Sequence, residues 1–164
     1  MVYDPERHHR YSTRLRNYPY HLSGMYCVTI CTSQRQEIFG QVQRGVMELN
    51  HVGNIVASEW EDLPRRFPSI LLDAFVVMPN HLHGILMISQ PIDCSAPTLG
   101  AVIGAFKSLS VRAVSLKIGE DGCKIWQRSY YDQILRSDSM LEGLRLYIHE
   151  NPARWPTDPE NIPL

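Results

Sequence analysis

Two histidines separated by a single residue form the part of the sequence best suited to chemistry. His81 and His83 follow a Pro-Asn turn and precede an apolar run, in the stretch MPNHLHGIL (78–86). Side chains alternate between the two faces of a strand, so both imidazoles should lie on one face while Leu82 points into a core. They would be about 6–7 Å apart, because a strand rises ~3.3 Å per residue. This spacing allows both to bind one metal ion. The alternative is two partly exposed histidines hydrogen-bonded to the backbone.

A tyrosine and an asparagine near the C-terminus could complete such a site. Tyr147 and Asn151 are four residues apart in a helix predicted over 139–151, so they share one face of it. The amide oxygen of Asn151 could bind a hard cation. The phenol of Tyr147 is a poor nucleophile at neutral pH, but a metal ion that polarises a phosphoryl group can help to position its attack. Taken singly, each residue has an ordinary explanation, a half-buried core tyrosine and a helix-end asparagine. The chemistry therefore depends on their combination with the histidine pair.

The spacing of apolar residues predicts the elements that position these side chains. Strands are expected at 24–32, 70–78 and 81–89 and within 124–135, and helices at 50–64, 98–117 and 139–151. The 70–78 strand is apolar on both faces, so we expect it to be central in its sheet. The order is that of a split βαβ, ferredoxin-like α+β fold, with helices packed on an antiparallel sheet and one additional C-terminal helix.

Several residues are predicted to mark the ends of the helices. Asn50 and Thr98 are suited to cap the first two helices. Ser139 has a glutamate three residues later, which is the spacing of a capping box. Pro64 and Pro152 are expected to end their helices, because the residue before a proline is pushed out of helical geometry.

The composition indicates one ordinary globular domain. The chain has 164 residues and a formal net charge of −1, which gives no overall reason to expect nucleic acid. The four cysteines form no C-x-x-C pair, nothing resembles a signal peptide, and we find no apolar run that approaches membrane-spanning length. These features predict a reduced cytoplasmic protein without a membrane partner.

Basic residues are concentrated in a few segments despite the neutral total. The first is an N-terminal arm, 1–23, where four arginines are interleaved with tyrosines: Arg7, Arg10, Arg14 and Arg16. Basic and aromatic residues together can hold a single nucleic acid strand by phosphate contact and stacking. A disordered tail is the alternative for residues 1–9.

Four further residues are candidates for DNA contact. Lys107 on the 98–117 helix could meet a phosphate, or it could lie on a solvated face. Tyr130 and Tyr131 beside Arg128 could stack on unpaired bases. We assign both tyrosines to binding or packing and prefer Tyr147 as the nucleophile.

Four stretches of the chain together resemble one known family. FVVMPNHLHGIL, LGAVIGAFKSLS, IWQRSYYDQILR and LRLYIHENPARW are similar to the REP-associated tyrosine transposases. These are single-tyrosine relatives of the insertion-sequence transposases in the HUH (His–hydrophobic–His) superfamily. The resemblance covers about residues 10–155. It divides the chain into the arm, a transposase domain at 24–155 and a tail at 156–164.

The resemblance implies a ferredoxin-like fold and an activity on DNA. Such an enzyme cleaves and rejoins single-stranded DNA at or near a hairpin, through a covalent 5′-phosphotyrosine. The family's nucleophile falls on Tyr147, and its metal ligands fall on His81, His83 and Asn151. The family's metal is Mg²⁺ or Mn²⁺, and two imidazoles suit Mn²⁺ better by ligand type. The substrate would be cytoplasmic, nucleoid-associated DNA, and the sequence allows a monomer or a homodimer.

Two other functions remain open from the sequence. The chain could bind DNA hairpins without turnover, or it could use the histidine pair as a metal-dependent hydrolase of small molecules. The basic arm and Lys107 argue against the hydrolase.

Overall fold

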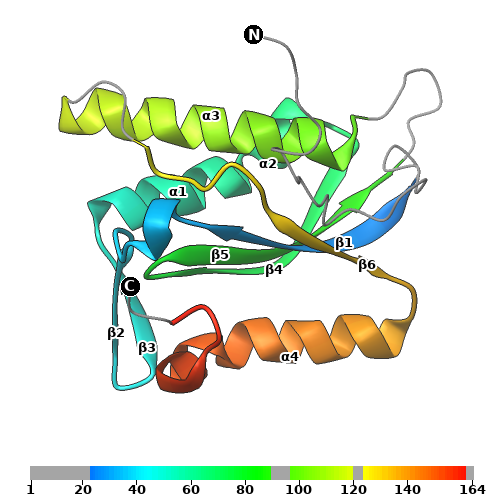
Figure 1. The fold of residues 1–164 in the computed structure, drawn as a ribbon. Coiled ribbons are helices and arrows are strands. Elements are labelled where there is room, and N and C mark those ends of the chain that lie inside the picture. The colour runs from blue at the N-terminus through cyan, green and yellow to red at the C-terminus, as the bar shows by residue number, and fades with distance from the viewer. Residues whose placement is uncertain (1–22, 90–96, 120–123, 162–164) are drawn as a thin grey trace, which may run out of the picture.

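Four strands form one antiparallel sheet in the order β4-β5-β1-β6 (Figure 1). Their bounds are Gly24–Cys31 for β1, Ile70–Met78 for β4, His81–Ile88 for β5 and Tyr131–Leu135 for β6. The structure is a computed structural model, and it describes residues 23–89, 97–119 and 124–161. Within this part β5 lies between β1 and β4. It is therefore the strand inserted into the split βαβ unit that β1 and β4 form.

Helices cover both faces of this sheet. Figure 1 shows α1 (His51–Glu61), the short α2 (Leu63–Arg66) and α3 (Leu99–Ile118) on one side, and α4 (Asp138–Arg154) on the other. The predicted ferredoxin-like α+β fold with an additional C-terminal helix is therefore confirmed.

The main core lies between the sheet and the α1–α3 layer. Every second residue of β1 is fully buried there: Tyr26, Val28 and Ile30. Trp60 of α1 packs edge-on against Phe106 of α3, with ring centroids 5.2 Å apart. The Trp60 ring also lies directly over Gly84 of β5, where a Cβ would come within 2.4 Å of it. The glycine that follows the two histidines is thus required by packing on the opposite face of their strand.

The strand β4 is an edge strand, so the expectation that it is central is wrong. It is apolar on both faces because helices cover both of them, and not because strands flank it on both edges. Asp73 on β4 forms an ion pair with Arg145 of α4, at 2.6 Å. The pairing of β4 with β5 is also irregular between Leu72 and Phe75. A charge and a bulge are devices that protect an exposed edge.

The helix ends are partly as predicted. Asn50 and Thr98 cap α1 and α3 by accepting from backbone N–H groups three residues on. The cap of α4 is Ser137 and not Ser139, because the Ser137 side chain accepts from the Met140 N–H. Pro152 lies inside α4, which runs on to Arg154. A proline in the last turn removes only one helical hydrogen bond, so the helix can continue past it.

Pro64 does not end the first helix as expected, because α1 ends before it and Pro64 itself lies in α2. The Asp62 backbone marks the end of α1, and Pro64 lies in the first turn of α2. Proline is well tolerated in a first turn, where its missing N–H has no helical partner.

A small hairpin was not predicted. Strands β2 (Gly40–Gln43) and β3 (Val46–Leu49) pair through a two-residue turn of Arg44 and Gly45, both with positive φ. This is the geometry of a type I′ hairpin, but Arg-Gly is a weak signal for it compared with Asn-Gly. The sequence also has no recognisable signal for the two 3-10 turns, Ser33–Arg35 and Trp155–Thr157.

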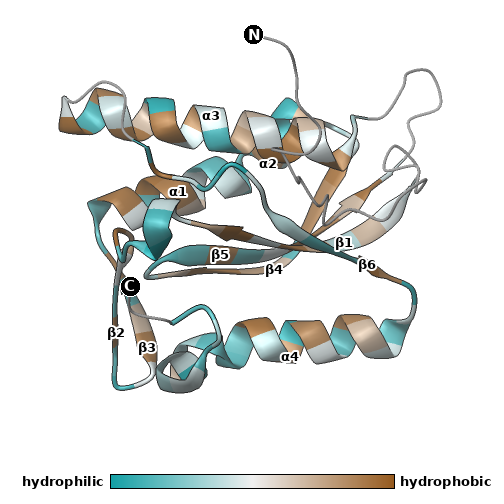
Figure 2. Ribbon diagram, viewed as in Figure 1, coloured by the Kyte–Doolittle hydropathy of each residue, from teal (hydrophilic) through white to brown (hydrophobic). Residues whose placement is uncertain are grey.

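One described helix, α3, is long and apolar enough to cross a membrane by length and composition alone. The expectation that no apolar run approaches this length is therefore wrong. The physical reason is that α3 fills the core: Val102, Ile103 and Phe106 are all buried against the sheet and α1. Figure 2 shows polar residues along the same helix, so it is amphipathic rather than apolar all round.

Candidate active site

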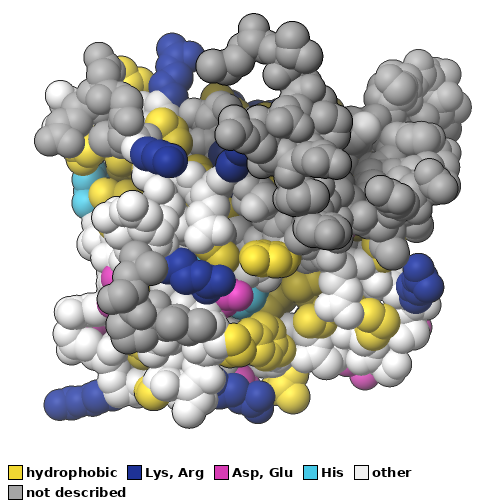
Figure 3. Space-filling model, in the orientation of Figure 1, with side chains coloured by type: hydrophobic (Ala, Val, Ile, Leu, Met, Phe, Trp, Pro, Cys, Tyr) yellow, Lys and Arg dark blue, Asp and Glu magenta, His cyan; other side chains and the backbone are white. Residues whose placement is uncertain are grey.

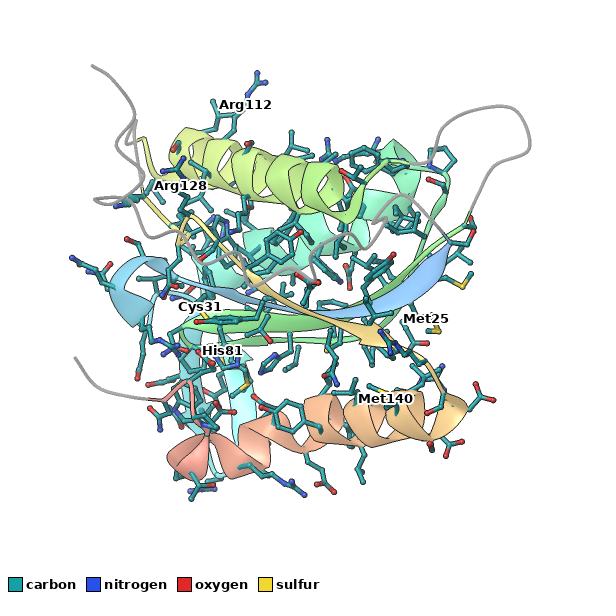
Figure 4. The ribbon with its side chains drawn as sticks, turned by 45° about the vertical axis from the view of Figure 1, so that its right-hand side comes forward. Met25, Cys31, His81, Arg112, Arg128 and Met140 are labelled. Atoms are coloured by element: carbon teal, nitrogen blue, oxygen red, sulfur yellow. The ribbon has the colours of Figure 1, made fainter. Side chains whose placement is uncertain are left out.

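His81 and His83 are buried on the face of the sheet that α4 covers. Their exposed fractions are 0% and 5%, so they are not the partly exposed pair of the alternative interpretation. Their ring centroids are 4.5 Å apart, and Leu82 between them points into the main core, as predicted. Figure 4 shows His81 between the sheet and the C-terminal end of α4.

The hydrogen bonds of Asn80 determine which nitrogen of His81 carries the proton. The Asn80 amide N–H donates to the backbone oxygen of Glu160 at 2.8 Å, which fixes the orientation of the amide. Its Oδ1 then lies 2.8 Å from Nδ1 of His81 and can only accept, so Nδ1 must carry the hydrogen. The lone pair of His81 is therefore on Nε2. That atom is buried and has no hydrogen-bond partner in the described part of the chain.

His83 is held by the neighbouring strand. Its Cα partner on β1 is Thr29, whose hydroxyl lies 2.8 Å from His83 Nδ1. Its Nε2 faces Tyr147. Burial lowers the pKa of His83 to about 4 and that of His81 to about 2. Both rings are therefore neutral at neutral pH, which is the form that binds metals.

Tyr147 and Asn151 project from α4 toward the histidines on the shared helix face that was predicted. The Tyr147 hydroxyl lies 3.4 Å from Nε2 of His83, and the two rings have centroids 5.3 Å apart. Ile148 anchors this part of α4 in a second small core with Cys27 and Ile85 of the sheet. Burial, followed by the charge of Asp158, raises the pKa of Tyr147, so the isolated site favours the neutral phenol.

Asp158 is a functional candidate that sequence reasoning missed. Its side chain is buried, and its Oδ2 accepts from the Asn151 amide at 2.7 Å and lies 3.5 Å from the Tyr147 hydroxyl. One ligand atom each from His81, His83 and Asp158 lie within 4.8 Å of one another. The only signal was an acidic residue just beyond the last helix, and no periodicity connects that residue to the site.

The segment that carries Asp158 folds back over the site. Trp155 packs near His81, with ring centroids 6.0 Å apart. Glu160 forms an ion pair with Arg35 and accepts from the Cys31 thiol at 3.2 Å. The start of the tail therefore closes one side of the site through contacts with β1 and the turn that follows it.

These acceptors fit a divalent cation. The Oδ1 of Asn151, like Nε2 of His81, is buried without a hydrogen-bond partner among the described residues. Together with His83 and Asp158 they offer two neutral imidazoles, an amide oxygen and a carboxylate. Unpaired buried acceptors are costly, and a bound cation would satisfy them. The mixed nitrogen and oxygen set suits Mn²⁺ better than Mg²⁺, which prefers oxygen ligands.

A cavity of about 500 Å³ opens beside Tyr147. It lies against the α4 face of the sheet, and its lining includes Cys27, Thr29, His83, Tyr131, Gln133 and Tyr147. Figure 3 shows a recess in the middle of this side of the molecule, with histidine, acidic, basic and hydrophobic side chains at its mouth. The site is therefore open to a substrate on the β6 side.

The remaining residues predicted to contact DNA do not all lie beside the histidines. Lys107 donates to the backbone oxygens of Gln127 (2.9 Å) and Ser129 (2.8 Å), and burial lowers its pKa to about 8. It thus joins α3 to the segment before β6, and it remains partly exposed in an open pocket that Arg128 also lines. Arg128 is exposed on the α3 side of the sheet (Figure 4), away from the histidines.

The two adjacent tyrosines have different surroundings. Tyr130 is 9% exposed and belongs to the main core, whereas Tyr131 is 50% exposed and lines the cavity. The four arginines of the arm, Arg7, Arg10, Arg14 and Arg16, lie outside the described residues.

The chain has a relative in sequence and resembles several solved structures. No family model matches it. It is 35% identical over 173 residues to an uncharacterized protein of Haemophilus influenzae strain Rd, with 95% of each chain covered. A solved REP-associated tyrosine transposase bound to a REP hairpin is 16% identical, with a TM-score of 0.56, and the match covers 86% of this chain and 74% of that one.

A second solved structure, a candidate transposase from Deinococcus radiodurans R1, is 19% identical with a TM-score of 0.52, and the match covers 83% of this chain and 95% of that one. At these identities the two likenesses concern the fold. The chain therefore belongs to one family with the H. influenzae protein, and it combines the fold of the REP-associated tyrosine transposase with a His–hydrophobic–His motif at His81 and His83.

Proposed function

We propose that this protein is a transposase that nicks and rejoins single-stranded DNA at or near a hairpin, with Tyr147 as the nucleophile. The observation that supports this most strongly is the position of the Tyr147 hydroxyl, 3.4 Å from His83 and beside a buried group of acceptors suited to a cation. His81, His83, Asn151 and Asp158 would hold Mn²⁺ or Mg²⁺. When bound, the cation would supply Lewis-acid polarisation of the scissile phosphate.

The proposed reaction exchanges one phosphate ester for another. The Tyr147 oxygen attacks phosphorus and forms a new P–O bond, while the bond to the 3′ oxygen breaks. The phenol gives up its proton, for which Asp158 Oδ2 at 3.5 Å is a neighbouring acceptor. The 3′ oxygen leaves as a hydroxyl after taking up a proton, and the 5′-phosphate stays on the tyrosine. A second 3′-hydroxyl can reverse the exchange, so strand joining needs no external energy source.

The substrate is proposed from both the comparisons and the chain's own residues. The solved transposase of the same fold is bound to a REP hairpin, which supports a hairpin substrate here. The arginines of the N-terminal arm and exposed Arg128 would contact the phosphates of the DNA. All the proposed ligands and the nucleophile come from one chain, which suits a monomer that acts on nucleoid DNA in the cytoplasm.

The test is an adduct assay. Labelled hairpin DNA with single-stranded flanks is incubated with the full chain and Mn²⁺ or Mg²⁺, and covalent protein–DNA species are separated under denaturing conditions. We expect an adduct that is lost in Tyr147→Phe and in His83→Ala. Tyr26→Phe is the matched control, because it removes a phenol from the opposite face of the sheet and should keep the adduct.

Two other outcomes would favour other functions. Tight hairpin binding with no adduct in either metal would support a hairpin-binding protein without turnover. No interaction with DNA would contradict the transposase proposal and leave the metal-dependent hydrolase as the better interpretation.

A further inference from the structure

One row of side chains runs across the α4 face of the sheet from the histidines to β6, the edge strand among the described residues. His83 on β5, Thr29 on β1 and Tyr131 on β6 are successive cross-strand partners. Neighbouring strands are ~4.8 Å apart, so Tyr131 lies about 10 Å from His83. Because β6 is the last strand of the sheet, Tyr131 stands at its edge.

The cavity beside Tyr147 extends along this row. The next row toward the end of β6 contributes Gln133 and its cross-strand partner Cys27, and Leu144 lines the cavity from α4. The Tyr131 side chain is half exposed, whereas most aromatic side chains of the described chain are in the cores. Gln133 is exposed, and its side chain has no hydrogen bond among the described residues. An open aromatic ring and an unpartnered amide therefore line one end of a cavity whose other end holds the proposed nucleophile.

We propose that this end of the cavity is a nucleobase subsite. Tyr131 stacks on one unpaired base next to the scissile phosphate, and Gln133 reads the edge of that base. The inference rests on the proposed function and adds to it the residues that select the cleavage position. Every base has a face that can stack on a tyrosine ring.

The geometry limits which base can occupy the subsite. The edge of β6 is only about 10 Å from His83, so a base bound there belongs to the nucleotides close to the cut. A glutamine amide pairs with adenine through one donor and one acceptor, which is a common specific contact to that base. We therefore expect a preference for adenine at one flanking position, and this preference should depend on Gln133.

The binding test uses the full chain in a Tyr147→Phe background, so that cleavage cannot occur. The probes are hairpins with single-stranded flanks that carry 2-aminopurine, a fluorescent analogue of adenine, at each flanking position in turn. We expect quenching at one position next to the cut. Tyr131→Ala should abolish it and weaken binding about five- to a hundredfold, the range expected for one lost stacking contact. Tyr131→Phe should retain both, since the ring is kept.

The control is Leu71→Ala, which truncates a side chain of similar exposure, 52%, on the opposite edge strand. It should leave quenching and affinity unchanged. In the protein with Tyr147 intact, DNA with adenine at the quenched position should be cleaved better than DNA with any other natural base there. Gln133→Ala should remove that preference.

The outcomes separate this inference from the proposed function. If the unmodified protein forms the covalent adduct but Tyr131→Ala behaves like Leu71→Ala in quenching and affinity, the subsite is wrong and the transposase assignment stands. If Gln133→Ala keeps the base preference, the edge-reading role is wrong. If no DNA forms an adduct or quenches, the proposed function fails and the subsite fails with it.

Discussion

The phenol oxygen of Tyr147 lies 3.4 Å from Nε2 of His83, although the two residues are 64 positions apart in the chain. One comes from the last helix and the other from the inner strand β5. The contact forms because α4 packs across the face of the sheet opposite to the main core, through Ile148 and its neighbours. A nucleophile and a candidate metal ligand are thereby held on separate rigid elements, which is the arrangement that best fixes catalytic geometry.

Asp158 should contribute to metal affinity. Asp158→Asn keeps the shape of the side chain but removes its charge. Mn²⁺ affinity should therefore fall at least tenfold, which is the loss typical of changes to the groups around a metal site. Calorimetric titration of the purified full chain with Mn²⁺ measures this. Glu142→Gln, an exposed neutralisation on α4, is the control. Equal affinities in the two variants would exclude Asp158 as a ligand.

Asn80 should act through His81. Asn80→Ala removes the acceptor that holds the proton on Nδ1 of His81, so we expect Mn²⁺ affinity to fall about ten- to a hundredfold. Asn80→Asp keeps an acceptor for Nδ1 but loses the donor to the Glu160 backbone, so it should bind the metal better than the alanine variant. Titrations of both variants decide this. An affinity that is the same in Asn80→Ala and in the unmodified protein would contradict the tautomer argument.

Glu160 should protect the Cys31 thiol. The Cys31 side chain is 2% exposed and donates to Glu160, and burial raises its pKa. Glu160→Ala should loosen the tail from Arg35 and speed alkylation of Cys31 several-fold, as followed by mass spectrometry of peptides. Cys27 is the internal control, because it lies in the cluster around Ile148 and should react no faster. Equal acceleration at both thiols would indicate general unfolding instead.

Gly84 and Gly104 should respond oppositely to alanine. A Cβ at Gly84 would meet the Trp60 ring at 2.4 Å, whereas one at Gly104 on α3 would meet nothing within 4 Å. Gly84→Ala should therefore lower the free energy of unfolding by about 1–3 kcal/mol through overpacking. Gly104→Ala should raise it by up to about 1 kcal/mol, since alanine favours a helix interior. Urea denaturation measures both changes, and destabilisation by Gly104→Ala would contradict the open environment.

The ion pair between Asp73 and Arg145 should make a small pH-dependent contribution to stability. The Arg145 guanidinium lowers the pKa of Asp73. Because the folded-state pKa is below the unfolded one, the contribution is complete above the ordinary pKa of an aspartate, ~3.9, and is lost as the pH falls through the lowered folded value. Asp73→Asn should therefore lower the urea midpoint slightly at pH 7, and the difference should vanish in strong acid. The pair is partly exposed, so 1 M salt should also reduce the difference. A difference that persists in strong acid would exclude the charge as its cause.

The sequence by itself determined the local features of this protein. The alternation His81-Leu82-His83 put two imidazoles on one face, because side chains of a strand have a period of two. The four-residue spacing of Tyr147 and Asn151 put both on one face of a helix. The caps Asn50 and Thr98 were also predictable, since a cap depends on hydrogen bonds within three residues of chain. These features are encoded over a turn or two of backbone, so composition and spacing were enough to find them.

Only the tertiary structure decided which distant residues meet. Asp158 reaches the histidines because the tail turns back at Trp155, and no local pattern specifies that turn. Lys107 donates to two backbone carbonyls of a segment about 20 residues away, a pairing that no local pattern predicts. The strand β4 is at the edge because sheet order depends on the packing of both helix layers at once. Contacts of this kind arise from the sum of many weak interactions over the whole fold, and a single stretch of sequence carries no separate signal for them.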